Sequence, residues 1–331
     1  MSKTEIVRVE NLKKYFPVEK SFLEKLLTRT RSFVRAVDGV TFSVRKGEVF
    51  TLAGESGCGK TTTGKLVLKL IPPTSGKVFF KDQEITKLGP EELRLLRRKM
   101  QIIFQDPYAS FNPRMRIGDA VGRPLEIHGL ASGEEKRKRV LAMLERVGLT
   151  PPEQFIELYP HQLSGGQRQR AAMARSLILE PEFIVADEPV SMIDVSLRTT
   201  IIDLMLDLKR ELQLTYLFIT HDLAVAKYIS DRIAVMYLGK IVEMGDKEEI
   251  FSNPMHPYTQ ALLSAIPVPN PKRKREAIKL GGEVPSAIKI PTGCRFHPRC
   301  PFTREICTEE EPELILTAAD HFVACHLTNK M

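Results

Sequence analysis

The sequence lacks any apolar run that approaches the roughly 18 residues a membrane-spanning helix requires. Residues 1–8 are polar and charged, so we expect neither a secretory signal nor a membrane anchor. Cysteine is scarce, with five residues in a chain of 331. We therefore expect a cytosolic protein, in which cysteines serve more often as thiols or metal ligands than as disulfides.

Length and charge narrow the class only coarsely. A chain of 331 residues exceeds one typical domain, so we expect a main body with an appended region. Apolar residues make up 43% and charged residues 27%, which is typical of a globular protein with a sizeable core. The net charge of +8 is compatible with nucleotides, nucleic acid or an anionic membrane surface, and does not choose among them.

Apolar runs of strand length alternate with helical segments through most of the chain. Strands are predicted at 6–9, 40–44, 49–53, 77–80, 101–104, 183–186 and 215–219. Helices are predicted at 61–70, 90–99 and 196–212, and within 116–179. Strands that alternate with helices of this length predict a parallel sheet with crossover helices.

Two segments differ from this pattern. The basic insertion 18–34 is interpreted as a solvated surface, with contact to anionic lipid as the alternative. It carries apolar residues at helical spacing, namely Phe22, Leu23, Leu26 and Leu27. After Gly245 proline becomes frequent, and four of the five cysteines follow, which indicates a C-terminal extension. Its basic run 272–275 fits a solvated linker better than a nuclear address.

Residues 54–61 match the pattern G-x-x-x-x-G-K-[ST] between a predicted strand and a predicted helix. Glycines let backbone N–H groups surround phosphate oxygens at a helix N-terminus, so a chance glycine-rich turn is the weaker interpretation. Lys60 is expected to reach the β- and γ-phosphates, and the Thr61 hydroxyl to bind Mg²⁺. Cys58 occupies a free position and needs no chemistry of its own. The residues expected to contact the nucleotide here are Gly54, Ser56, Gly57, Cys58, Gly59, Lys60, Thr61 and Thr62.

The strand 183–186 is followed by two carboxylates, Asp187 and Glu188. Ligands bind at the carboxyl ends of strands in open α/β sheets, which places both side chains where a nucleotide is expected. Asp187 is predicted to hold Mg²⁺, directly or through water. Glu188 is predicted to orient and deprotonate the attacking water, a role worth about 10²–10⁴-fold in rate.

A second candidate anion site is the pentapeptide 163–167, Leu-Ser-Gly-Gly-Gln. It offers a hydroxyl and free amides at the start of a helix, from Ser164, Gly165, Gly166 and Gln167. One nucleotide has no need of two phosphate cradles from one chain. We therefore expect this surface to close on a nucleotide held by another subunit.

In these motifs the sequence resembles the ABC ATPases, in which the pentapeptide is the signature motif and works across a head-to-tail dimer. The resemblance implies that Gln105 is the glutamine that meets Mg²⁺ and water and senses the membrane partner. It implies that His221 contacts the γ-phosphate, and that Phe16 stacks on adenine, with Tyr15 as the fallback. The segment 191–194 occupies the D-loop, where Met-Ile replaces the more usual Ala-Leu.

The C-terminal extension resembles that of ATPases from oligopeptide and dipeptide importers, closest to the second of their two ATPase types. The resemblance rests on 105–113, on 256–259 and on four cysteines, Cys294, Cys300, Cys307 and Cys325. Related subunits bind a [4Fe–4S] cluster there, which four thiolates suit. Structural zinc, free thiols and disulfides are the alternatives. His297, His321 and His326 are alternative ligands, though ordinary surface histidines are expected.

The fold class implied is a P-loop NTPase, an α/β protein with a RecA-like parallel core, an antiparallel β subdomain and an inserted helical subdomain. The expected ATPase domain is 1–240, with its nucleotide-binding core at 1–88 and 180–240 and its helical signature subdomain at 89–179. The expected extension is 241–331 and holds the four-cysteine site.

The expected function is ATP hydrolysis, with ATP and Mg²⁺, to power peptide import. The expected partners are a second ABC ATPase in a head-to-tail heterodimer, two membrane permeases and, through them, an extracytoplasmic substrate-binding protein. The expected location is the cytoplasmic face of the cell membrane, with no nucleic acid bound. Oligosaccharide and nickel importers remain alternatives for the cargo. A nucleic-acid ABC ATPase is the alternative class, supported only by the basic charge.

Overall fold

A computed structural model describes residues 4–18, 32–266, 278, 280–318 and 320–328. Most of the basic insertion, with its four apolar positions, and the run 272–275 lie outside the described residues. The chain divides into two compact units. Unit 1 comprises Met1–Ile6, Val44–Val49 and Lys87–Ile219, and unit 2 comprises Val7–Ser43, Phe50–Thr86 and Thr220–Met331.

Unit 1 contains three parallel strands with β7 in the middle. They are β6 (Met100–Ile103), β7 (Phe183–Asp187) and β8 (Thr215–Thr220). Every residue of β7 and β8 is buried, which explains their continuous apolar sequences, because parallel strands are covered on both faces. The predicted strands in this unit are therefore present, with ends that differ by one residue.

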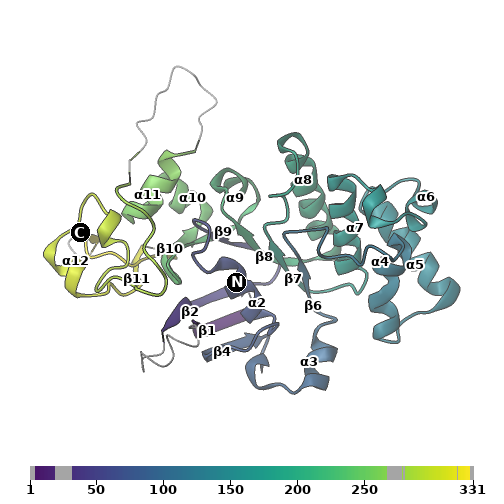
Figure 1. The fold of residues 1–331 in the computed structure, drawn as a ribbon, viewed down its shortest axis with the longest axis horizontal. Coiled ribbons are helices and arrows are strands. Elements are labelled where there is room, and N and C mark those ends of the chain that lie inside the picture. The colour runs from purple at the N-terminus through teal and green to yellow at the C-terminus, as the bar shows by residue number, and fades with distance from the viewer. Residues whose placement is uncertain (1–3, 19–31, 267–277, 279, 319, 329–331) are drawn as a thin grey trace, which may run out of the picture. The chain divides into compact units, whose positions relative to one another are not determined.

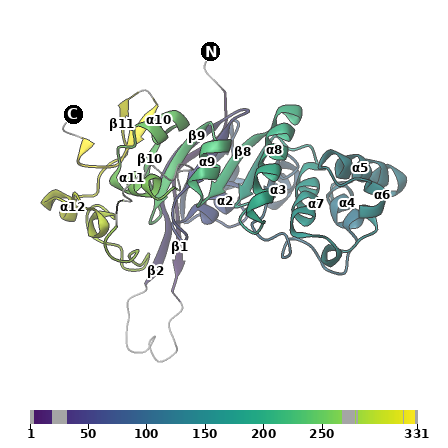
Figure 2. The ribbon, with the colours of Figure 1, turned by 90° about the horizontal axis from the view of Figure 1, so that it is seen from above.

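The helices of unit 1 include a group inserted between β6 and β7 (Figures 1 and 2). α4 packs against α5, α6 and α7 through buried residues one helical turn apart, Ile117, Val121 and Leu125. The helices are α3 (Pro90–Leu96), α4 (Ile117–Ile127), α5 (Gly133–Arg146), α6 (Pro152–Ile156), α7 (Gly165–Leu177) and α8 (Val195–Leu212), with the 3₁₀ turn η2 (Pro160–Gln162). The prediction of mostly helical structure here is confirmed.

Unit 2 holds an antiparallel sheet in the order β2-β1-β4-β5. Its strands are β1 (Glu5–Pro17), β2 (Phe33–Arg45), β4 (Ser75–Phe80) and β5 (Gln83–Glu84). The predicted short strands 6–9 and 40–44 are parts of β1 and β2, which have 13 residues each. The sequence showed only the portions where polar and apolar residues alternate.

A second group of strands in unit 2 has the order β11-β12-β10-β9-β3. β3 and β9 are parallel, with Leu52 opposite Ala234, and the outer pairs are antiparallel. Glu243 of β10 pairs with Val323 of β12, so the extension adds a strand to this sheet. The strands are β3 (Val49–Ala53), β9 (Arg232–Tyr237), β10 (Lys240–Asp246), β11 (Ile315–Ala318) and β12 (His321–Val323).

The helices of unit 2 are short. They are α2 (Lys60–Val67), α9 (Leu223–Ile229), α10 (Lys247–Ser252), α11 (Pro257–Ser264) and α12 (Glu305–Glu309), with the 3₁₀ turns η1 (Ile85–Lys87) and η3 (His297–Arg299). The predicted end of α2 at residue 70 was wrong. Lys69 has φ of 47°, and the Leu70 N–H bonds the Lys65 carbonyl at 2.8 Å, which closes the helix as glycine ordinarily does.

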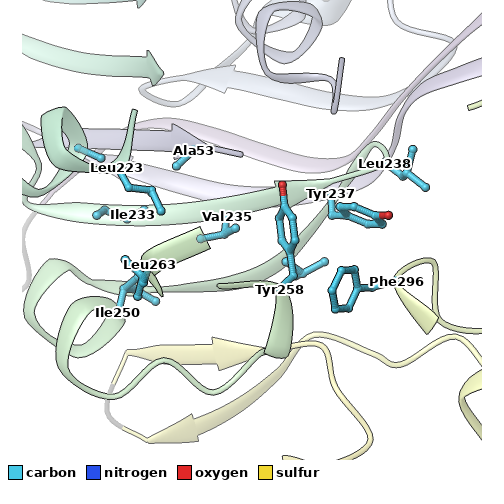
Figure 3. Close-up of a cluster of buried hydrophobic side chains, with 12 residues drawn as sticks. Ala53, Leu223, Ile233, Val235, Tyr237, Leu238, Ile250, Tyr258, Leu263 and Phe296 are labelled. Atoms are coloured by element: carbon cyan, nitrogen blue, oxygen red, sulfur yellow. The ribbon is translucent and has the colours of Figure 1, made fainter. Parts of the chain in front are cut away.

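A hydrophobic cluster joins β9, α11 and Phe296, the residue before η3, inside unit 2 (Figure 3). The rings of Tyr237, Tyr258 and Phe296 gather at one end of it, with centroids 4.7 to 5.4 Å apart and tilted or edge-on. These geometries are the preferred ones for aromatic pairs. The parallel strands of both units and the antiparallel sheet of unit 2 confirm the predicted mixed α/β fold.

Candidate functional site

The glycine-rich loop 54–61 joins β3 to α2 inside unit 2. Gly59 precedes the helix with φ of 107°, and a Cβ there would lie 2.2 Å from the Ala36 carbonyl oxygen. Gly54 has φ of 145°, and a Cβ would lie 2.3 Å from the Met236 oxygen. Both positions therefore require glycine, because a side chain would displace the loop from the neighbouring strands.

Lys60 is only 4% exposed and folds back across this loop. Its Nζ donates to the carbonyl oxygens of Gly54 at 2.7 Å and Glu55 at 2.9 Å. These carbonyls hold the ammonium at the start of α2, where the helix dipole also favours an anion. The loop is thus arranged to receive phosphate.

Cys58 is buried beside Lys60, with its Sγ 3.6 Å from Nζ. Burial raises the pKa of its thiol, and the nearby ammonium opposes that rise. A protonated, buried thiol is a poor nucleophile. This environment agrees with the prediction that Cys58 fills space.

In unit 1, Gln105 and Glu188 are in direct contact. Gln105 Nε2 donates to Glu188 Oε2 at 3.0 Å. Glu188 follows buried Asp187 with φ of 45°, and its N–H donates to the Ile219 carbonyl at 2.9 Å, which fixes the backbone that carries the carboxylate. Ser191 Oγ donates to the Glu188 carbonyl at 3.0 Å. Residues predicted separately from the strand and the glutamine loop thus lie together.

The signature segment begins α7. Ser164 is its N-cap and accepts from the Gln167 N–H at 3.3 Å, while Gln167 Oε1 accepts from the Ser164 N–H at 3.0 Å. This reciprocal capping box leaves Ser164 and Gly165 exposed, and a Cβ on Gly165 would meet nothing within 4 Å. The segment therefore presents an exposed, internally held helix start.

Arg168 supports this segment and was not identified from the sequence. It is 1% exposed, and it donates to the Pro160 carbonyl at 2.8 Å and the Leu163 carbonyl at 2.7 Å. Its guanidinium lies 3.3 Å from the ring centroid of Tyr108, in the loop after β6. The sequence shows arginine beside the signature motif, but not the carbonyls that it binds.

The other predicted nucleotide residues lie at element ends. His221 follows β8 and is exposed. Phe16, near the end of β1, is 38% exposed, with Lys14 Nζ 5.1 Å from its ring centroid. Tyr15 instead donates its hydroxyl to Asp38, and burial with this bond raises its pKa to about 12. The more exposed of the two rings is therefore that of Phe16.

The four cysteines of the extension line one cavity with His256, Phe296, His297, Phe302 and His326. Cys294 N–H donates to the Cys307 carbonyl at 2.8 Å, and none of the four is in a disulfide. Burial raises the pKa of the Cys294 thiol to about 11, and a backbone N–H from Phe296 opposes the rise. Phe302 and Leu327 supply similar N–H groups to Cys300 and Cys325.

The cysteine cavity holds four sulfur atoms, three of which have a backbone N–H group beside them. Backbone N–H groups directed at sulfur are the partners that stabilise metal-bound thiolates. Within the described ranges, however, no three His, Cys, Asp or Glu side chains are set at the spacing of a metal site. The hypothesis of a metal cluster therefore depends on the four cysteine sulfurs and on the cavity that they share.

The three alternative histidine ligands have other partners. His297 Nδ1 lies 2.9 Å from the Cys294 carbonyl, and His326 Nε2 lies 3.0 Å from the Glu310 carbonyl. His321 was expected at the surface, which is wrong. It is fully buried, with Nε2 2.8 Å from Glu243 Oε1, because β12 carries it inward against β10.

A phosphate loop, a strand ending in two carboxylates and a capped signature helix together define an ATPase of the ABC class. Residues 37–191 match the family model described as ABC transporter, and residues 242–307 match the oligopeptide/dipeptide transporter C-terminal region. In the ranges that the structure describes, no helix has the length and apolar character to traverse a bilayer.

Curated relatives extend the similarity over almost the whole chain. The oligopeptide transport ATP-binding protein AppF of Bacillus subtilis is 49% identical over 325 residues, covering 97% of each chain. The dipeptide transport ATP-binding protein DppF of Haemophilus influenzae is 47% identical over 322 residues, covering 97% of this chain and 96% of its own. The chain belongs to the family of oligopeptide and dipeptide transport ATP-binding proteins.

A solved structure shows the same cassette fold. An ATP-binding cassette dimer in a post-hydrolysis state, bound to ADP and Pi, has a TM-score of 0.63 and 30% identity. The match covers 73% of this chain and 98% of that one. The predicted activity, an ABC-type ATPase coupled to transport, is confirmed by this fold and by the family.

Proposed function

We propose that this subunit hydrolyses ATP through its own phosphate loop and paired carboxylates, and that it powers the import of short peptides. Lys60 and Thr61 hold the phosphates and Mg²⁺, with Asp187 and Gln105 as further Mg²⁺ ligands. Glu188 takes the proton of the attacking water, and His221 contacts the γ-phosphate. The observation that carries the proposal is the Gln105–Glu188 hydrogen bond, which orients the carboxylate expected to act as base.

The adenine is proposed to stack on Phe16, since that ring is exposed while Tyr15 is bonded to Asp38. The remaining phosphate contacts come from the loop amides and hydroxyls of Ser56, Gly57, Gly59 and Thr62. Ser164, Gly165, Gly166 and Gln167 act on the nucleotide of a companion subunit. The exposed helix start at Ser164 supports that role, because its own capping bonds leave the surface open.

We infer a head-to-tail pair with a second ATPase, docked at the cytoplasmic face of the membrane on two permeases. An extracytoplasmic binding protein delivers the cargo through them. The match at 242–307 and the names of the relatives favour peptide as the cargo. The proposed ATPase domain is 1–240, with its core at 1–88 and 180–240 and a helical subdomain at 89–179, followed by the extension 241–331.

The catalytic role is tested with Glu188→Gln, which keeps the size and hydrogen bonding of the side chain but removes the base. This variant should bind ATP, form the dimer and turn over at least about 100-fold more slowly than the wild type. The matched control is Glu145→Gln, an exposed position on α5. Unchanged hydrolysis by Glu188→Gln would exclude the role, and ATP binding by Lys60→Ala would exclude the phosphate loop.

For the four cysteines, the proposed occupant is a [4Fe–4S] cluster, which would supply a covalent tie among residues distant in sequence. Cys294, Cys300, Cys307 and Cys325 would hold it, stabilised by the backbone N–H groups. Protein purified without oxygen should be brown and contain about four irons per chain. Cys294→Ser should lose the iron and Cys58→Ser should keep it. Colourless protein with one zinc per chain would favour the alternative metal.

A further inference from the structure

The cysteine segment, residues 294–307, carries two buried arginines, and one of them binds the phosphate loop directly. Arg299, beside Cys300, is 9% exposed. It donates through both terminal nitrogens to Glu55, at 2.8 Å and 3.1 Å. Glu55 is the second residue of the loop 54–61. Bidentate pairs of this kind combine strong attraction with a fixed geometry, so the orientation of Glu55 depends on Arg299.

The backbone of Glu55 is held as firmly as its carboxylate. Its N–H donates to the Tyr258 hydroxyl at 2.9 Å, and its carbonyl accepts from Lys60 at 2.9 Å. Tyr258 in turn packs against Phe296 of the cysteine segment, with ring centroids 5.4 Å apart (Figure 3). Arg299 and Tyr258, the two residues from outside the loop that bond Glu55, therefore both belong to the extension.

Arg295, beside Cys294, makes a second connection. It is 7% exposed and donates to the Leu238 carbonyl at 2.6 Å, to Glu311 at 3.1 Å and to Asp38. Asp38 also accepts the hydroxyl of Tyr15, the neighbour of Phe16. A rearrangement of residues 294–300 would therefore reach both the phosphate loop and the end of β1.

We propose that the cysteine segment is a clamp on the nucleotide site, in which Arg299 is a positioning residue for the phosphate loop. Arg299 neutralises the Glu55 carboxylate next to the place where the triphosphate binds, and it fixes the loop backbone through that carboxylate. Without Arg299, an unpaired negative charge faces the polyanion and ATP binds more weakly. The proposal rests on ATP binding at this loop, as described under the proposed function.

The test compares Arg299→Gln, Glu55→Gln and the double variant in the full-length chain, with ATP affinity measured by calorimetry. Arg299→Gln should weaken ATP binding about 5- to 50-fold, which lies within the usual range for coupled sites. The double variant should recover to within about 3-fold of the wild type, because the unpaired carboxylate is gone. In the complete transporter, KM for ATP should rise in Arg299→Gln while kcat stays the same. Arg304→Gln, an exposed arginine of the same segment, is the control.

Two results would overturn the clamp. One is wild-type affinity in Arg299→Gln, and the other is a double variant as weak as Arg299→Gln alone, which would indicate general loss of structure. Should Arg299→Gln fail to fold, Arg299→Lys replaces it, with an expected weakening of about 2- to 5-fold that Glu55→Gln again relieves. Failure of the proposed function is distinguishable, since the wild type would then bind no ATP or Lys60→Ala would bind it normally.

Discussion

Gln105 Nε2 lies 3.0 Å from Glu188 Oε2, so the glutamine loop and the carboxylate after β7 are joined by a side-chain hydrogen bond. The bond holds Oε2 of the Glu188 carboxylate against the glutamine amide. A movement of the Gln105 loop would therefore change the orientation of the proposed base. The contact therefore couples the position of the glutamine loop to that of the proposed base.

We predict that Gln105→Ala lowers kcat for ATP by about 10-fold or more with little change in KM. The carboxylate loses its orienting donor, while the phosphate loop keeps its contacts. Steady-state hydrolysis by the assembled transporter is the measurement. The control is Gln101→Ala on β6, whose amide bonds only the Arg97 carbonyl among the described contacts. Equal losses in the two variants would point to a general effect on β6.

We predict that Arg168→Met weakens ATP-dependent dimerisation while the single chain still binds ATP. The change leaves the Pro160 and Leu163 carbonyls without their donor and removes the stack on Tyr108, at a cost of about 2–4 kcal/mol to local stability. Dimerisation is measured by light scattering in the Glu188→Gln background. The control is Arg139→Met on α5, whose pair with Glu135 is exposed. A normal dimer from Arg168→Met would contradict the supporting role.

We predict that Phe16→Ala weakens ATP binding by about 5- to 160-fold, because one base–aromatic stack contributes about 1–3 kcal/mol. Tyr15→Phe keeps the ring and removes only the hydroxyl that bonds Asp38, so its effect on ATP should stay within about 3-fold. Binding is followed with a fluorescent ATP analogue. The reverse order of effects would assign the adenine contact to Tyr15.

We predict that the imidazole of His128, just after α4, titrates below its ordinary pKa of 6.5. Burial lowers this pKa, and Arg98 and Arg94 lower it further. As pH falls below 6.5 the unfolded chain takes up this proton before the folded chain does, so stability decreases with acid in that window. NMR titration of the ring measures the pKa directly. Arg98→Ala should move it upward, and a value above 6.5 in the wild type would refute the prediction.

The local motifs could be predicted because their chemistry depends on short spacings. The loop 54–61, the carboxylates after β7 and the Ser164 cap each lie within a few residues, so one stretch of sequence carries the whole signal. The Arg299–Glu55 pair joins residues 244 positions apart, and only tertiary packing brings them together. The burial of His321 had no local signal either, because it depends on pairing between β10 and β12.

The ends of helices and strands also divide into those that the local sequence predicts and those that it does not. The buried strands β7 and β8 were found as apolar runs, whereas β1 and β2 were found only in part, since their outer residues face solvent without strict alternation. The C-terminus of α2 was missed because Lys69 adopts a left-handed conformation usually occupied by glycine. Propensity alone cannot reveal a closure that backbone hydrogen bonds impose.

The pairing of β12 with β10 also occupies backbone hydrogen-bonding groups at one edge of β10. β12 covers a strand edge of β10, and β11 pairs in turn with the other edge of β12. A polypeptide cut short before His321 would present that edge to solvent, and open edges recruit strands from neighbouring molecules. Removal of residues 321–328 should therefore raise the tendency of the protein to aggregate.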